Sequence, residues 1–257
     1  RLRIACGAIR PALTFHGTFV FMSLLEHYQR ALEQPDMVED RAQQMAVEKL
    51  DRLAQRLVSR RDSMLERLKR RFPVLPVTIT PVTGLYLWGG VGRGKTWLMN
   101  MFFEALPFHD KKRIHFHHFM LDIHGKLDRL NKSMDRRSKD PLEKIARDIA
   151  SQTRVICIDE FIVTNITDAM ILSELLHALF QNGVTMVATS NRVPDDLYLN
   201  GLQRERFLPA IGLIKRRMQV LHLDSAVDHR RELLEQQGLY FCPIEEDTDE
   251  HLMREFE

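Results

Sequence analysis

Residues 84–96 read GLYLWGGVGRGKT, and this segment constrains the fold more than any other part of the chain. A short apolar run is followed at once by glycines, one lysine and one threonine, in the Gly-x-x-x-x-Gly-Lys-Thr order of the Walker A motif. The motif predicts a strand, a glycine-rich loop and a helix that begins at Lys95. Backbone N–H groups of such a loop point toward phosphate oxygens, so the segment predicts a nucleoside triphosphate site. The candidate contact residues are Gly89, Gly90, Val91, Gly92, Arg93, Gly94, Lys95, Thr96 and Trp97.

Lys95 and Thr96 have separate expected roles in this site. The lysine is long enough to reach the β and γ phosphate oxygens, and the threonine hydroxyl is a ligand for magnesium. The helix that begins at Lys95 adds the positive end of its dipole. The expected cofactors are therefore ATP and Mg²⁺.

A second segment, residues 154–160, reads RVICIDE and predicts a buried strand that ends in two carboxylates. The carboxyl ends of parallel strands meet at one edge of a sheet, where the phosphates are expected. We expect Asp159 to hold magnesium, through water, and Glu160 to polarise the water that attacks the γ-phosphate. A simple kinase or a slow GTPase switch does not require the adjacent glutamate, so the pair favours hydrolysis.

Three further polar residues are candidates for the same chemistry. Asn191 follows the apolar run at 184–189, where it can orient the attacking water or, as the alternative, cap the turn before Pro194. Arg204 and Arg206 stand at the entrance to a predicted helix. They are either solvated surface residues or arginine fingers that stabilise transition-state charge across a subunit boundary.

The remaining pattern predicts an α/β fold with a parallel sheet, because apolar strands alternate with amphipathic helices after residue 83. The expected strands are 84–88, 113–120, 154–158, 184–189 and 218–223, and the expected helices are 95–106, 121–131, 141–151, 167–182 and 206–217. Two helices are expected before the sheet, at 23–34 and 39–71, followed by a proline-containing linker.

Composition limits the classes of function without selecting one. The chain has 257 residues and a formal net charge of only +2, so no global field attracts nucleic acid or an anionic membrane. No apolar run is long enough for a membrane span, and the three cysteines lack metal-binding spacing. We expect a leader or extension at 1–21, a helical segment and linker at 22–82, an ATPase core at 83–230, and at 231–257 the start of a C-terminal region that continues further.

Several segments resemble the ZapE family of bacterial cell-division ATPases and its mitochondrial relatives, which belong to the AAA+ class. They are GLYLWGGVGRGKTWLM, HFHHFM, IDEF with ITDAM, and ATSN with DDLYLNGLQRERFLPAI, and together they cover about residues 84–230. The resemblance implies a P-loop NTPase of AAA+ type, with a five-stranded parallel sheet in the order 5-1-4-3-2, flanking helices and an N-terminal helical extension. It also implies a homo-oligomer in the bacterial cytoplasm that associates with the division-ring protein FtsZ.

The resemblance assigns the same roles by motif. Lys95 and Thr96 form the Walker A pair, Asp159 and Glu160 the Walker B pair, Asn191 is the sensor, and Arg204, followed by Arg206, is the favoured finger. Asn100 stands where the family often has aspartate, and His118 where it often has arginine.

Other interpretations remain open at this point. The basic stretch at 126–139 is either a solvated loop or a partner contact, and in a small-molecule kinase it would act as a phosphate-clamping lid. A nucleotide-gated adaptor, or a nucleic-acid binder of the helicase-loader kind, is the second alternative. We favour ATP hydrolysis coupled to remodelling of a protein partner, and we expect neither nucleic-acid binding nor stable membrane insertion. His115 and His117 alternate along an expected strand, which does not favour a metal site.

Overall fold

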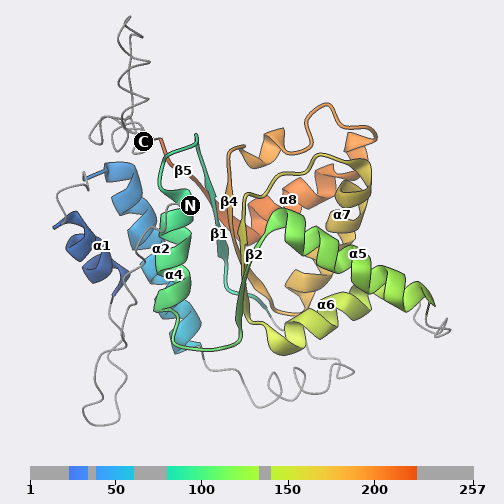
Figure 1. Cartoon of the computed structure of the whole chain (residues 1–257), viewed down its shortest axis with the longest axis horizontal. Coiled ribbons are helices and arrows are strands. Elements are labelled where there is room, and N and C mark those ends of the chain that lie inside the picture. The colour runs from blue at the N-terminus through green and yellow to red at the C-terminus, as the bar shows by residue number, and fades with distance from the viewer. Residues whose placement is uncertain (1–22, 34–38, 61–79, 133–139, 225–257) are drawn as a thin grey trace, which may run out of the picture.

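The computed structural model describes residues 23–33, 39–60, 80–132 and 140–224 (Figure 1). At their centre is a five-stranded sheet in the order β2-β3-β4-β1-β5, in which every neighbouring pair is parallel. The strands are β1 (Gly84–Trp88), β2 (Lys111–His115), β3 (Val155–Asp159), β4 (Thr185–Ser190) and β5 (Met218–His222). Counted from the other edge, the order is 5-1-4-3-2, so the predicted fold class is confirmed.

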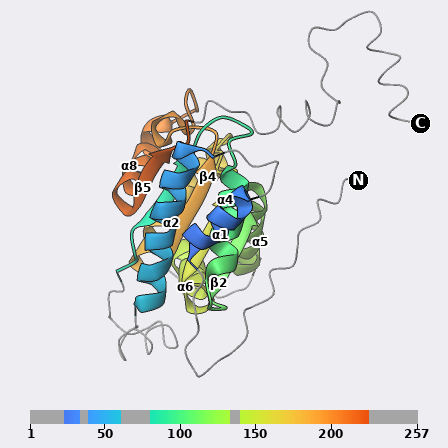
Figure 2. The same cartoon turned by 90° about the vertical axis from the view of Figure 1, so that its left-hand side faces the viewer.

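Helices cover both faces of the sheet (Figure 1). One face carries α1 (Leu24–Leu32), α2 (Arg41–Ser59) and α4 (Lys95–Ala105). The other carries α5 (Phe116–Lys132), α6 (Pro141–Gln152), α7 (Ile166–Gln181) and α8 (Leu208–Arg217). Figure 2 looks onto the first face, where α2 lies along the sheet beside α4 and α1 packs over α4.

Alternation along the strands explains the two layers of helices. Leu85 and Leu87 of β1 belong to the hydrophobic cluster with α1, α2 and α4, whereas Tyr86 between them packs with α5 to α8. In β3, Cys157 belongs to the first cluster and Ile158 to the second. Since successive side chains point to opposite faces, a sheet buried on both sides requires strands that are nearly continuous apolar runs.

Polar side chains fix where several helices begin. The N-cap residues, whose side-chain oxygens accept backbone N–H bonds of the first turn, are Ser23, Asp40, Asp140 and Asn165. Such a cap contributes about 1 kcal/mol to helix stability. The helix of the Walker A segment differs, because its N-cap is Gly94, which has no side chain to bond to the first turn.

Two sequence predictions of secondary structure are wrong. The strand expected at 113–120 ends at His115, and α5 begins at Phe116, because Phe116, Phe119, Met120 and Ile123 recur at helical spacing and are all buried. His115 and His117 therefore do not alternate along one strand. The helix expected at 39–71 ends at Ser59, since the next residue has extended backbone angles.

Some expectations fall outside the described residues. These are the extension at 1–21, the region at 231–257, the end of the basic stretch at 133–139, and the part of the linker at 61–79. The division of the chain into domains stays a prediction. Within the described segments, none of the helices is both long and apolar enough to span a bilayer.

Candidate nucleotide-binding site

The order of the strands brings the predicted site segments to one edge of the sheet. β1 leads into the loop at 89–94, β3 ends at Asp159, and β4 leads into Asn191. β4 lies between β1 and β3, so its end separates the loop from the two carboxylates. Trp88 pairs with Ser190, and the Gly89 N–H donates to the Ser190 carbonyl at 3.2 Å. This edge is where parallel α/β sheets bind ligands.

Glycine is required at both ends of the loop. A Cβ on Gly89 would lie 2.5 Å from the carbonyl oxygen of Leu223, which is too close for any other residue. Gly94 has a φ of +77°, in the left-handed region that glycine adopts without strain. Gly94 is also the N-cap of α4, and it has no side chain that could bond to the first turn. Backbone N–H groups at a helix N-terminus suit an anionic ligand.

Lys95 is buried and folds back over the loop. Its Nζ donates to the carbonyl oxygens of Gly89 at 2.7 Å and Gly90 at 2.5 Å. The ammonium group is therefore held at the loop by backbone carbonyls, close to where the motif requires a positive charge. Thr96 is exposed, whereas the Trp97 ring lies 6.0 Å from that of Tyr28 in α1.

The N-terminal helices also contact this loop. Gln43 of α2 is buried, and its Nε2 donates to the Arg93 carbonyl at 3.4 Å. A Cβ on Gly94 would lie 2.8 Å from the same nitrogen. α2 therefore supports the loop through Gln43, a contact that no sequence motif predicted.

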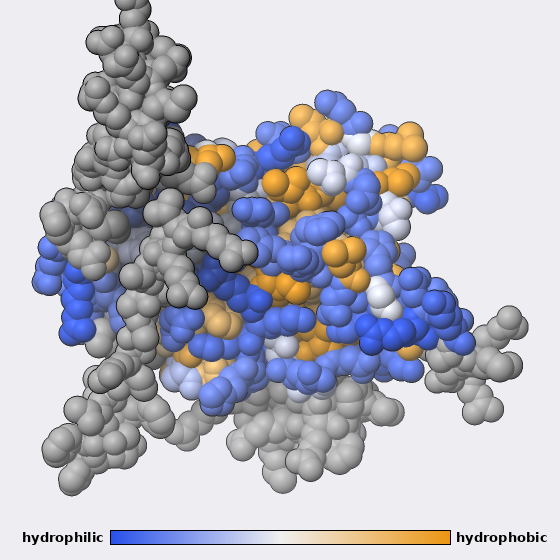
Figure 3. Space-filling model, in the orientation of Figure 1, coloured by the Kyte–Doolittle hydropathy of each residue, from blue (hydrophilic) through white to orange (hydrophobic). Residues whose placement is uncertain are grey.

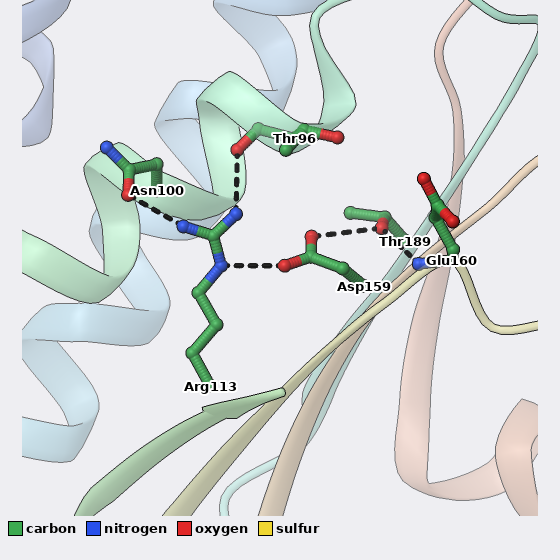
Figure 4. Close-up of polar contacts among 6 residues, drawn as sticks. All are labelled: Thr96, Asn100, Arg113, Asp159, Glu160 and Thr189. Atoms are coloured by element: carbon green, nitrogen blue, oxygen red, sulfur yellow. Dashed lines mark hydrogen bonds and ion pairs between the residues drawn. The ribbon is translucent and has the colours of Figure 1, made fainter. Parts of the chain in front are cut away.

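Asp159 and Glu160 have contrasting environments (Figure 4). Asp159 is 1% exposed, and its Oδ1 accepts from the Thr189 hydroxyl at 3.4 Å. Glu160 is exposed, and its N–H donates to Thr189 Oγ1 at 3.2 Å. Glu160 also has a φ of +55°, which costs energy in a residue with a side chain and is typical of functional positions. Thr189 thus contacts both carboxylate residues, and no sequence motif predicted this role.

Arg113 of β2 is a third contributing residue, after Gln43 and Thr189, that no sequence motif predicted. Its Nε donates to Asp159 Oδ2 at 2.7 Å, and its Nη1 donates to Asn100 Oδ1 at 2.6 Å. Its Nη2 lies 3.5 Å from the Thr96 carbonyl oxygen (Figure 4). The guanidinium therefore joins α4 to β3 at the predicted magnesium position. The available signal was a charged residue in the middle of a strand. Because the strand was expected to begin at residue 113, Arg113 was placed at its first position and not in its interior.

The two candidate finger residues follow β4 in the chain. They form the 3-10 helix η2 (Arg204–Arg206), after a loop that includes η1 (Pro194–Asp196). Arg204 is half-buried and donates from Nη2 to the Asp195 carbonyl at 2.5 Å, whereas Arg206 is exposed. Among the described residues, neither has a hydrogen bond to the loop at 89–94 or to the carboxylates of β3.

Burial also changes the acidity of two groups beneath the site. It raises the pKa of the Cys157 thiol, and the negative charge of Asp159 adds to the effect. It raises the pKa of Tyr86 as well, so this hydroxyl stays protonated and donates to the Arg192 carbonyl at 2.9 Å. That hydrogen bond fixes the backbone immediately after Asn191.

Comparison of the sequence with known proteins shows which family the chain belongs to. The family profile described as AFG1-like ATPase matches residues 22–257. The chain belongs to the AFG1-like ATPase family. It is 45% identical over 228 residues to the cell division protein ZapE of Escherichia coli strain K12, covering 86% of this chain and 60% of that protein. The resemblance to ZapE inferred from the sequence motifs is therefore confirmed.

More distant relatives share less of the chain. The lactation elevated protein 1 homolog B of Danio rerio is 43% identical over 184 residues, covering 69% of this chain and 37% of that protein. The chain thus spans 60% or less of the length of these two relatives. The structure of AMPPCP-bound DnaA from Aquifex aeolicus aligns with a TM-score of 0.50 at 11% identity, over 85% of this chain and 59% of that one. A likeness at this level concerns the fold alone.

Proposed function

We propose that the chain binds ATP with Mg²⁺ and hydrolyses it. The observation that carries this proposal is the pair at the end of β3, where a buried Asp159 is followed by an exposed Glu160 with strained backbone. Both lie at the sheet edge that also carries the loop of Lys95. A buried carboxylate suits a fixed cation site, and an exposed one is free to contact water.

The residues at this edge fit the proposed cofactor. The loop holds an ammonium group between two carbonyls, and the N-cap of α4 is a glycine, which offers no side chain to the first turn. Thr96 and Asp159 would hold magnesium, which when bound neutralises charge on the phosphate oxygens. Glu160 would orient the attacking water and accept its proton, with Asn191 as a second polar contact. Arg204 or Arg206 of a neighbouring chain would stabilise the transition-state charge.

We further propose that hydrolysis remodels a protein of the bacterial division ring, with FtsZ as the favoured partner. The identity of 45% with a cell division protein supports this proposal, although the chain spans 60% of that relative. We place the protein in the bacterial cytoplasm as a homo-oligomer, and a mitochondrial homologue is the alternative. Nucleic-acid binding is not part of the proposal.

The substitution Glu160→Gln tests the catalytic part. It removes the proton acceptor but keeps the shape of the side chain, so ATP affinity should stay within about twofold while the rate of phosphate release falls at least 100-fold. Glu174→Gln, an exposed glutamate of α7, is the matched control and should leave both quantities unchanged. Binding and release are measured with a fluorescent ATP analogue and a phosphate assay.

The alternatives give different results in the same experiment. A small-molecule kinase would transfer phosphate to an acceptor and show little turnover without it. A nucleotide-gated adaptor would bind its partner in the presence of ATP whether or not Glu160 is replaced. Undiminished turnover in the Glu160→Gln variant would remove this residue from its proposed role.

A further inference from the structure

Arg113 contacts three residues at or beside the proposed magnesium position. Its guanidinium contacts the Asp159 carboxylate at 2.7 Å, the Asn100 amide oxygen at 2.6 Å and, at 3.5 Å, the backbone carbonyl of Thr96 (Figure 4). The side chains of Arg113 and Asp159 are 22% and 2% exposed, so water screens this ion pair only weakly. One cation of the protein thus links the two residues that are proposed to hold Mg²⁺.

Asp159 is the counterion of Arg113, because the other groups that accept hydrogen bonds from this guanidinium are neutral. Asn100 offers a neutral amide oxygen, and Thr96 offers a carbonyl oxygen. Within the described segments, the one carboxylate that bonds to Arg113 is therefore that of Asp159. The other oxygen of this carboxylate faces the Thr189 hydroxyl at 3.4 Å.

The neighbouring cations of β2 are directed elsewhere. Lys111 Nζ donates to the carbonyls of Phe103 and Leu106 at the end of α4, at 2.6 and 2.7 Å. Lys112 Nζ lies 3.5 Å from a carboxylate oxygen of Asp122 in α5. Of these three consecutive cations, only Arg113 contacts Asp159. The contact is therefore specific to one residue and is not a general effect of a basic strand.

We propose that Arg113 is a positioning residue that competes with a divalent cation for the Asp159 carboxylate and so sets the Mg²⁺ concentration that the site needs. This inference rests on the proposed ATPase function. A positive charge within hydrogen-bond distance of a carboxylate lowers the affinity of that carboxylate for a second cation, because the two cations repel each other. Arg113 also holds the carboxylate in place and neutralises it in the absence of Mg²⁺.

The substitution Arg113→Met tests the competition, because it removes the charge and keeps most of the apolar stem. Binding of a fluorescent ATP analogue is measured in the full chain while Mg²⁺ is titrated. The Mg²⁺ concentration for half-maximal binding should fall about tenfold. With EDTA present, the analogue should bind more weakly than to the wild type, because Asp159 then repels the phosphates without compensation.

Lys112→Met is the matched control, since it removes the same charge from the next residue of the same strand. It should leave both binding curves unchanged. An equal shift of the half-saturating Mg²⁺ concentration in the two variants would mean that any lost positive charge has this effect, which contradicts a specific role of Arg113. An unchanged Mg²⁺ requirement in Arg113→Met would contradict the proposed competition. An increased Mg²⁺ requirement would also overturn it, because Arg113 would then help to build the cation site.

Asn100→Asp provides a second variant that retains Arg113. The new carboxylate would lie 2.6 Å from Nη1 and would share the guanidinium with Asp159. The half-saturating Mg²⁺ concentration should therefore fall, by less than in Arg113→Met. In the double variant, Asn100→Asp should add little to Arg113→Met if it acts through the arginine. A full additive effect would mean that the new carboxylate binds the cation itself, which contradicts the proposal.

A measurement without nucleotide separates this inference from the ATPase proposal. Thermal unfolding of the protein alone is followed with and without Mn²⁺. Arg113→Met should melt about 5–10 °C below the wild type, because it leaves a buried carboxylate without its counterion. Mn²⁺ alone should restore more of the melting temperature in this variant than it adds to the wild type. A wild type that binds no nucleotide would overturn the ATPase function, and equal Mn²⁺ shifts would overturn the role of Arg113.

Discussion

Glu160 shows how one residue combines strain with a proposed chemical role. Its φ of +55° lies in a region that residues with a Cβ seldom occupy, and its backbone N–H is fixed by the Thr189 hydroxyl at 3.2 Å. The preceding residue, Asp159, ends the buried strand. The turn of the backbone thus directs two adjacent carboxylates into different environments (Figure 4). Strain of this kind costs about 1–3 kcal/mol and persists where the surrounding structure holds it.

Replacing Glu160 by glycine should relieve that strain. We expect Glu160→Gly to raise the free energy of unfolding by about 0.5–1 kcal/mol, since the lower strain is partly offset by the larger entropy of glycine in the unfolded chain. Phosphate release should be lost. Chemical denaturation measures the stability, with Glu160→Gln as the control that loses activity but keeps the strain. Equal stability of the two variants would show that the φ angle is not strained.

Some site residues could be predicted because each belongs to a contiguous motif. Lys95, Thr96, Asp159 and Glu160 are candidates from two short segments, which the sheet brings to one edge. The contacts of Arg113 could not be predicted in this way, because they depend on the register between two strands. Arg113 pairs with Cys157, two residues before Asp159, and reaches the carboxylate only along the sheet.

At the scale of elements, a buried carboxylate connects α1 to α2. Asp51 of α2 is 4% exposed, and its Oδ1 accepts from the Leu24 N–H at 2.9 Å and from the Ser23 hydroxyl at 3.2 Å. Its Oδ2 accepts from Gln55 Nε2 at 2.6 Å. One buried carboxylate therefore holds the start of α1 on α2, and α1 in turn packs its Tyr28 near Trp97 of α4.

Weakening this carboxylate should loosen α1 selectively. Asp51→Asn removes the charge from three hydrogen bonds, so we expect the free energy of unfolding to fall by about 1–3 kcal/mol. Hydrogen exchange should increase most in α1. Glu48→Gln on the same helix is the control, because Glu48 forms an exposed pair with Arg52 at 3.8 Å that contributes little. Uniform exchange changes across the sheet would argue against a local role for Asp51.

The errors in predicted elements also have a physical origin. The segment HFHHFM contains two phenylalanines separated by histidines, which fits a strand over a few residues and a helix over a longer window. Burial of Phe116, Phe119, Met120 and Ile123 against the other helices selects the helix. The strands of the sheet centre were predicted to within one or two residues because they are buried on both faces and have no such ambiguity.

At the scale of the whole molecule, the sheet brings the proposed ATP site to the edge where β1, β3 and β4 end, and the candidate finger residues lie in η2, after β4. On the face visible in Figure 3, outside the grey atoms, hydrophobic residues form small groups separated by hydrophilic ones. Near η2, the exposed apolar side chains are Leu199, Leu202 and Leu208. A neighbouring chain that completed the site would therefore meet a mixed surface that includes two arginines.

If an arginine acts across a subunit boundary, the hydrolysis rate per chain should increase with protein concentration. Arg204→Ala and Arg206→Ala should each be measured at saturating ATP, and a finger variant should lose turnover with ATP affinity near that of the wild type. Arg204 donates to the Asp195 carbonyl, so its variant needs a melting curve to separate misfolding from lost catalysis, whereas Arg206 is exposed.

Mixing the inactive finger variant with Glu160→Gln should restore part of the turnover, because each chain then supplies what the other lacks. If a well-folded mixture stays inactive while the wild-type rate is independent of concentration, the site is completed within one chain and neither arginine acts in trans.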